Sequence, residues 1–122
     1  MFDHFEIKVL KFDECVRFYS IVLQPLYIEL KWSDDSAAGF GSAAEDKTRF
    51  LIEKQAGSSV CNVHIALKAA SESVVNKFYT AGVEQGYVCN SKPGLRDNYA
   101  PNYYAAFLLD PDGNNIEAVV YL

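Results

Sequence analysis

The chain has 122 residues, half of them apolar, with 11 basic and 16 acidic side chains that give a net charge of −5. This length predicts one domain with a sizeable core, and the apolar content excludes a disordered chain. The basic residues form no cluster, so nucleic acid and anionic membranes are not expected partners. The opening segment does not resemble a signal peptide, no apolar run is long enough to span a bilayer, and the three cysteines lack a C-x-x-C pair, so free thiols and a cytoplasmic location are expected.

The first half of the chain predicts a strand, a helix and three further strands. Phe5, Ile7 and Val9 alternate with polar residues, which indicates a strand with one apolar face. A helix is expected next, with Asp13 as its N-cap and an end before Pro25, because the residue before a proline avoids the helical region. Three strands are then expected at 26–32, 37–42 and 48–54, followed by a polar connector at 55–59.

The second half predicts the same order of elements. Ser71 is expected to cap a helix that runs to about residue 85 and is ended by Gly86. The last strand is entered through the DPDGN segment at 110–114, where Pro111 fixes φ for a tight turn and Gly113 allows a positive φ. The strands are expected at 61–69, 87–90, 102–109 and from 116 onward, with a loop at 91–101.

A shift of 60 positions aligns the two halves. His4 falls on His64, and the other matches are Ile7 on Leu67, Lys8 on Lys68, Arg17 on Lys77, Phe18 on Phe78 and Tyr19 on Tyr79. With a shift of 64, the pair Ile52-Glu53 falls on Ile116-Glu117. The repeat predicts two βαβββ modules, at about 1–56 and 60–122, within one α+β domain in which two half-sheets close on each other.

The repeat places a histidine on the first strand of each module and a glutamate on the last. In each strand the candidate lies on the face opposite the apolar stripe. A carboxylate in an apolar strand costs free energy unless it is solvated, paired or bound to a cation. Half-exposed strand positions are the alternative for each residue taken singly. As a set, two imidazoles and two carboxylates suit a divalent metal ion, and the candidate ligands are His4, Glu53, His64 and Glu117.

The segments DHFEIKV, RFYSIVL, HIALKA and FLLDPDGNNIEAV together resemble the vicinal oxygen chelate superfamily, which contains glyoxalases, extradiol dioxygenases and the fosfomycin and bleomycin resistance proteins. The resemblance covers essentially the whole chain. It implies a glyoxalase-like fold, in which two βαβββ modules pair into a curled mixed sheet around a cavity. It also implies a homodimer, a small-molecule substrate, and a divalent ion (Zn, Ni, Co, Mn or Fe) held by the same four residues, within one chain or across two.

The set of four ligands is similar to that of lactoylglutathione lyase, which implies a metal-dependent lyase or isomerase. The ion would act as a Lewis acid toward two adjacent substrate oxygens, with Glu117 or Glu53 as the catalytic base. Two alternatives stay open. One is an extradiol-type Fe(II) dioxygenase that uses His4, His64 and Glu117 without Glu53. The other is a small-molecule binding protein of the bleomycin or fosfomycin resistance type.

The segment PGLRDNYAPNYYAAF at 93–107 resembles a bacterial branch of this superfamily and carries candidate substrate contacts. Arg96 offers a forked donor to an anionic or planar substrate, and Tyr99 and Tyr103 offer polar tips on apolar bodies, as does Tyr104. Lys8 stands where glutathione-using relatives commonly carry arginine. The alternative is structural, with Arg96 bonded within the loop and the tyrosines packed.

Overall fold

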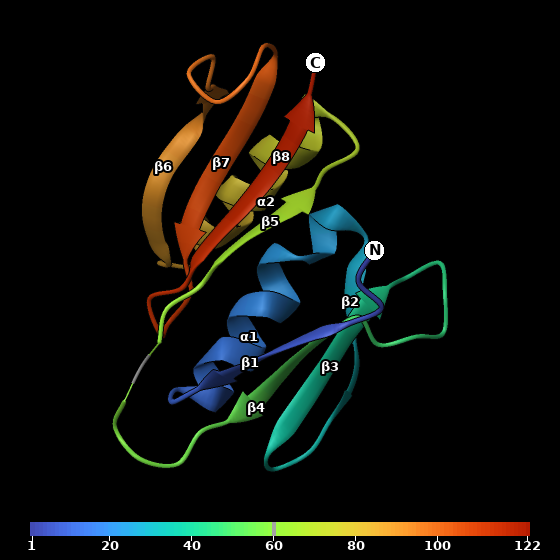
Figure 1. The fold of residues 1–122 in the computed structure, drawn as a ribbon, viewed down its shortest axis with the longest axis vertical. Helices are drawn as coiled ribbons and strands as arrows, with labels where there is room; N and C mark the ends of the chain where they lie inside the picture. Colours follow the sequence, from blue (N-terminus) through green and yellow to red (C-terminus); the bar gives the residue numbers. More distant parts are fainter. Residues whose placement is uncertain (60) are drawn as a thin grey trace.

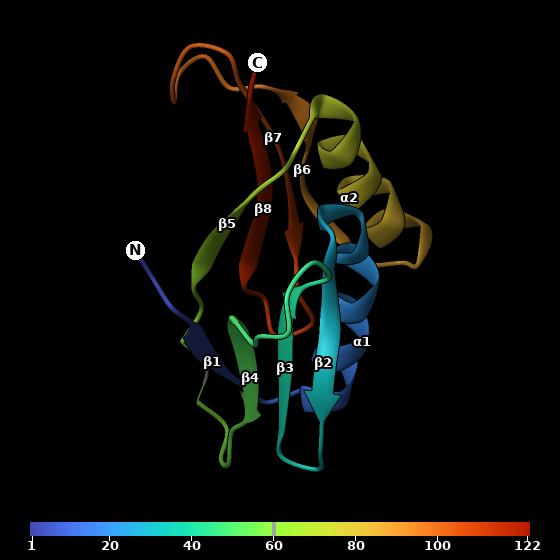
Figure 2. The same ribbon diagram turned by 90° about the vertical axis from the view of Figure 1, so that its right-hand side faces the viewer.

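The computed structural model describes residues 1–59 and 61–122, and it arranges them as two four-stranded sheets with both helices on one side (Figures 1 and 2). The first module contains β1 (Phe5–Val9), α1 (Phe12–Val22), the 3-10 turn η1 (Gln24–Leu26), β2 (Ile28–Ser33), β3 (Ala37–Ser42) and β4 (Phe50–Lys54). The second contains β5 (His64–Lys68), α2 (Glu72–Glu84), β6 (Val88–Leu95), β7 (Tyr103–Leu109) and β8 (Asn115–Tyr121). The predicted α+β class is confirmed. The start of the second module at residue 60 lies outside the described residues.

The two sheets have the same topology. Their strand orders are β1-β4-β3-β2 and β5-β8-β7-β6, and in each the first strand runs parallel to the last strand of its module. The remaining pairs are antiparallel. The sheets follow each other along the long axis of the molecule, with β1 and β5 at neighbouring edges (Figure 1). Neither helix in the described part of the chain is long and apolar enough to cross a bilayer.

The strand registers differ from the sequence repeat in how they align the last strands of the two modules, β4 and β8. Phe5 pairs with Phe50 and Ile65 pairs with Ile116, so position 50 corresponds to position 116, a shift of 66. Leu51 therefore occupies in the first module the place that Glu117 occupies in the second. Glu53 lies two residues further along its strand. Because side chains alternate with a period of two, Glu53 still shares a face with Leu51.

One hydrophobic core extends across both modules. It contains the buried face of α1, including Cys15, Phe18 and Tyr19. From α2, Phe78 is fully buried, and Gly82 allows a close approach, because a Cβ there would lie 2.5 Å from a methyl group of Leu108. The helices thus cover one face of each sheet and leave the opposite faces open.

The expected N-cap of α1 is wrong. The helix begins at Phe12, after Lys11, and Asp13 lies within its first turn without capping it. The backbone N–H groups of Leu10 and Lys11 instead donate to the carboxylate of Asp112, at 2.7 and 2.8 Å. Capping rules consider only neighbouring residues, whereas Asp112 belongs to the turn before β8. The predicted Ser71 cap of α2 is confirmed, with its hydroxyl accepting from Val74 N.

The strand expected at 87–90 continues as β6 to Leu95, so the start of the expected loop at 91–101 is wrong. Pro93 lies within this strand. The register with β7 shifts between Cys89 and Ser91 and again before Gly94. An edge strand tolerates both features, because its outer N–H groups need no partner and a bulge relieves the mismatch.

The buried hydroxyl of Tyr19 should make the free energy of unfolding depend on pH in the alkaline range. This hydroxyl donates to the carboxylate of Asp110, and burial, followed by the charge of Asp110, raises the pKa of Tyr19 well above its usual value. The unfolded pKa is about 10, so this contribution is complete below about pH 10 and is lost as pH rises toward the folded value. We expect the free energy of unfolding to fall above about pH 10, and Tyr19→Phe to fall less steeply. Urea unfolding across this range measures both slopes, and equal slopes would contradict the assignment.

Candidate metal and substrate site

Glu117 is the most deeply buried charged residue of the described structure. It lies in β8 on the sheet face that points away from α2, with its residue only 1% exposed. Its Oε1 lies 2.8 Å from Nε2 of His64, and its Oε2 accepts a hydrogen bond from the hydroxyl of Tyr103. Both oxygens therefore have partners, which explains how this apolar strand tolerates a carboxylate.

Tyr103 covers Glu117 from the neighbouring strand. Its ring packs against a small cluster of Ala105, Phe107 and Val119, which is separate from the main core. Burial, and then the hydrogen bond to Glu117, raise the pKa of Tyr103 above its usual value. The phenol consequently stays protonated and donates to the carboxylate at neutral pH.

An aromatic patch surrounds this pair. Tyr103 makes edge contacts with Tyr99 and Tyr121, at centroid distances of 5.3 and 5.2 Å. The Phe107 ring lies 6.1 Å from the ring of His64 and 5.5 Å from the guanidinium carbon of Arg96. Such a patch can hold a planar group against the open face of the sheet.

Arg96 lies on this patch and is also anchored to the strand that precedes it, β6. Its Nη2 donates to the Oγ of Ser91 at 2.6 Å and to the backbone carbonyl of Lys92 at 2.5 Å. The structural alternative considered for Arg96 is therefore present in the structure. An additional contact of Arg96 with substrate stays a prediction.

Of the candidates of the first module, Glu53 lies on the open face of the other sheet, whereas His4 directly precedes its first strand, β1. His4 is exposed, and its Nδ1 lies 2.7 Å from a carboxylate oxygen of Asp3. Glu53 is half-buried and stands opposite the exposed Lys8 in the register of β1 and β4. Sequence reasoning missed Glu6, which alternates onto the same face as His4. Burial, and then a hydrogen bond with Glu53, raise the pKa of Glu6.

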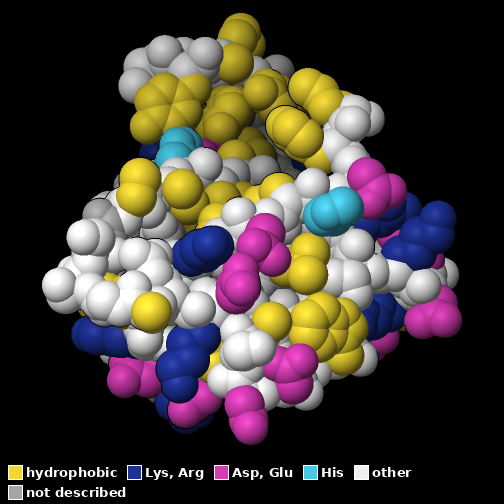
Figure 3. All heavy atoms as spheres, turned by 60° about the horizontal axis from the view of Figure 1, so that its bottom comes forward, with side chains coloured by type: hydrophobic (Ala, Val, Ile, Leu, Met, Phe, Trp, Pro, Cys, Tyr) yellow, Lys and Arg dark blue, Asp and Glu magenta, His cyan; other side chains and the backbone are white. Residues whose placement is uncertain are grey.

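One chain does not gather the four predicted ligands into one cluster. Within residues 1–59 and 61–122, no group of three or more histidine, cysteine, aspartate or glutamate side chains is placed to hold a metal ion. The histidines lie apart on the surface in Figure 3. A single chain brings together His64 and Glu117 on one sheet and leaves Glu53 on the other sheet, with His4 just before the first strand of that sheet.

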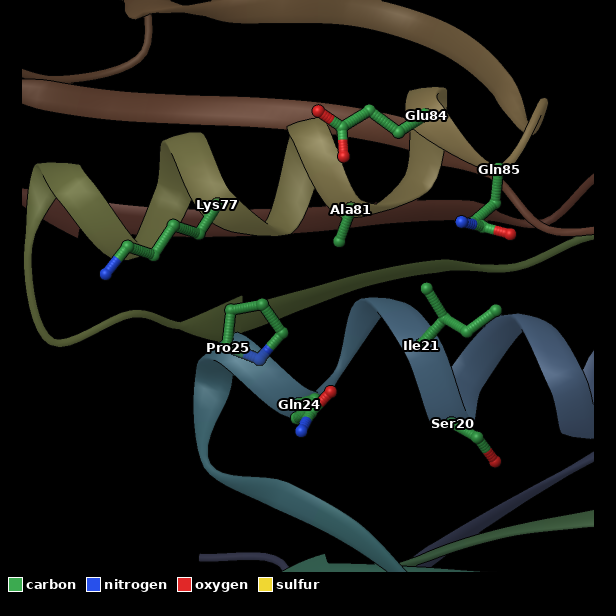
Figure 4. A pocket seen from close by; sticks show the side chains of 8 residues that line it. All are labelled: Ser20, Ile21, Gln24, Pro25, Lys77, Ala81, Glu84 and Gln85. Carbon is green, nitrogen blue, oxygen red and sulfur yellow. The ribbon is translucent and has the colours of Figure 1, made fainter.

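Two pockets of the structure differ in their distance from the candidate site residues, because only one of them is lined by such a residue. A pocket of about 400 Å³ lies between β1 and β5, and His64 and Glu6 are the ionisable residues on its mostly apolar wall of Phe2, Phe5, Glu6, Ile7, Val63, His64, Ile65 and Ala66. A larger one, about 540 Å³, lies on the helix side between α1 and α2 (Figure 4). None of the predicted site residues lines this larger pocket, so the smaller pocket is the one that adjoins the candidate site.

The His64 and Glu117 pair fits half of a divalent metal site. An imidazole nitrogen and a carboxylate oxygen, 2.8 Å apart on one face, are donors that borderline divalent ions prefer in proteins. The carboxylate is buried beside apolar side chains, where a cation would offset its charge. Within the described residues, no third histidine, cysteine, aspartate or glutamate joins this pair.

Solved structures share this fold. A glyoxalase/bleomycin resistance protein from Albidiferax ferrireducens is 28% identical, with a TM-score of 0.80 and 98% of each chain covered. A lactoylglutathione lyase from Agrobacterium tumefaciens is 15% identical, with a TM-score of 0.72 and coverage of 98% of this chain and 92% of that one. A glyoxalase/bleomycin resistance protein/dioxygenase family enzyme from Burkholderia phytofirmans is 14% identical, with a TM-score of 0.74 and 98% of each chain covered.

No protein-family model matches the sequence, and neither does any curated protein compared with it. The two paired βαβββ modules define the glyoxalase-like class of fold. Over nearly its whole length the chain is similar in fold to solved members of the glyoxalase/bleomycin resistance protein/dioxygenase family, which agrees with the resemblance of its sequence segments to the vicinal oxygen chelate superfamily. Its activity and ligands are separate questions, because superfamily members differ in chemistry while sharing the fold.

Proposed function

We propose that the protein is a divalent-metal-dependent lyase or isomerase, related to lactoylglutathione lyase, which binds a small substrate through adjacent oxygens. The observation that carries this proposal is the buried Glu117, held beside His64 on the open face of a glyoxalase-like sheet. A buried carboxylate with an imidazole partner in an otherwise apolar strand is typical of a functional site rather than of a packing element.

The proposed ligand set is His4, Glu53, His64 and Glu117, shared between two chains of a homodimer. The separation of the two pairs within one chain supports an arrangement in which the first module of one copy faces the second module of the other. Each open sheet face would then supply half of the site. The ion would supply Lewis acidity toward the substrate oxygens.

The other roles belong to side chains of this protein. Glu117, or Glu53 across the interface, would move a proton between substrate atoms as the general base. Arg96 and Tyr99 would hold an anionic or planar part of the substrate against Phe107, and Lys8 would add a positive charge from the first module. We also propose a cytoplasmic location, because the three cysteines are free thiols and thiols stay reduced in the cytoplasm.

Elemental analysis of the purified protein, followed by a turnover screen of hemithioacetals with Zn, Ni, Co, Mn and Fe, tests the proposal. We expect a bound or readily reconstituted divalent ion and metal-dependent isomerisation. Protein that takes up no ion and gains no thermal stability from any of the five would contradict the proposal and favour small-molecule sequestration.

A second candidate is the Fe(II) dioxygenase. The register of β4 supports this candidate, because the position equivalent to Glu117 is Leu51 and Glu53 lies two residues further along the strand. Glu53 would then not be a ligand. A set of His4, His64 and Glu117 would then suffice, as in two-histidine, one-carboxylate iron sites. Oxygen consumption with catechols that requires ferrous ion and survives Glu53→Ala would favour this candidate over the lyase.

A further inference from the structure

Tyr103 makes a hydrogen bond to one oxygen of the Glu117 carboxylate. Its hydroxyl donates to Oε2, while Oε1 faces Nε2 of His64. The sequence predicted that Tyr103 touches substrate, yet in the structure its hydroxyl group contacts the candidate metal ligand. Oε2 of Glu117 therefore accepts from the neutral phenol of Tyr103. Oε1 lies beside His64, where a metal ion could bind both Oε1 and Nε2 of His64.

The local sequence explains how Tyr103 reaches so far along the sheet. Tyr103 pairs with Tyr121 in the register of β7 and β8, and Glu117 pairs with Phe107. The pair between them is Ala105 and Val119, and Tyr103 packs against the cluster that these two residues form with Phe107. Because Ala105 ends at its Cβ, the phenol ring has room to lie along the sheet toward the carboxylate.

We propose that Tyr103 is a positioning residue that keeps Oε2 of Glu117 occupied, so that this carboxylate presents Oε1 alone to a bound cation. This inference rests on the proposed metal-binding function and reassigns Tyr103 from substrate contact to support of a ligand. A carboxylate free to rotate can offer both oxygens to one ion, which consumes a coordination position that a substrate oxygen needs. Hydrogen bonds to ligating groups commonly fix their orientation and affinity in this way.

Two matched variants test the role. Tyr103→Phe removes one hydroxyl and keeps the ring against the cluster of Ala105, Phe107 and Val119. Tyr104→Phe removes one hydroxyl from the next residue of the same strand. The sequence named Tyr104 as a candidate substrate contact, and the structure places its phenol on the helix side, where it donates to Asn76 of α2 at 2.7 Å. The readouts are Co²⁺ affinity by titration and the visible absorption spectrum of the Co²⁺-loaded protein, which reports coordination number. Circular dichroism verifies the fold of both variants.

We expect Tyr103→Phe to lower Co²⁺ affinity by about 10- to 100-fold and to change the Co²⁺ spectrum, while Tyr104→Phe matches the unaltered protein in both. Unaltered protein that binds Co²⁺, together with a Tyr103→Phe variant of the same affinity and spectrum, would overturn this inference and leave the proposed function intact. An equal loss in both variants would also overturn it, since the effect would then reflect the strand rather than the contact. Unaltered protein that binds no Co²⁺ or other divalent ion would overturn both.

Discussion

Asp110→Ala is expected to lower the free energy of unfolding by about 3 to 5 kcal/mol, more than most single substitutions. The Asp110 carboxylate is buried and accepts four hydrogen bonds, from the backbone N–H groups of Asp112 and Asn114, the side chain of Asn114 and the hydroxyl of Tyr19. Alanine leaves those buried donors without an acceptor. It also loosens the turn that presents Asp112 to the start of α1. Urea unfolding followed by circular dichroism measures the change.

Asp35→Ala is the matched control, because Asp35 is exposed and accepts no hydrogen bond from the described residues. We expect its effect to stay within about 0.5 kcal/mol. If Asp110→Ala costs less than about 1 kcal/mol, the turn is not the link between modules that the hydrogen bonds describe.

Glu117→Gln is expected to abolish metal-dependent turnover and to weaken metal binding by at least about 100-fold, while leaving the fold intact. An amide has nearly the shape of the carboxylate. Its oxygen can still accept from Tyr103 and its nitrogen can donate to His64. The free energy of unfolding of the metal-free protein should therefore change by less than about 1 kcal/mol, or increase, because a buried charge is removed. Titration with Co²⁺ and turnover assays measure the first two effects.

The control for this variant is Glu84→Gln, which makes the same chemical change at an exposed residue of α2 that lines the larger pocket (Figure 4). It should bind metal as the unaltered protein does. Full turnover in Glu117→Gln would remove Glu117 from both of its proposed roles, as ligand and as base. A variant that fails to fold would contradict the expected hydrogen-bond replacement by the amide.

Much of the fold was predictable because local signals and the repeat agree. Alternation in the first strand and the serine cap of α2 each predict the element that forms. The cap of α1 was not predictable in this way. Asp112 accepts from the two backbone N–H groups before that helix, which are 101 and 102 residues away, and no neighbouring residue indicates the contact.

The candidate site was predictable in part for the same reason. Strand parity identified the open faces that carry His64 and Glu117, and the structure places these two side chains in contact. The role of Tyr103 depends on cross-strand register and on the small side chain of Ala105, which strand parity does not specify. The register of β4 likewise moves Glu53 two positions from the place that the sequence repeat assigned.

The most direct test of a shared metal site mixes two defective chains. His4→Ala removes a proposed ligand of the first module, and His64→Ala removes a proposed ligand of the second. Neither variant alone should bind a divalent ion as the unaltered protein does. After joint refolding of equal amounts, half of the dimers would combine both chains, each with one intact site, so binding should recover to about one quarter of the unaltered capacity. No recovery in a mixture shown to contain heterodimers would contradict the shared site.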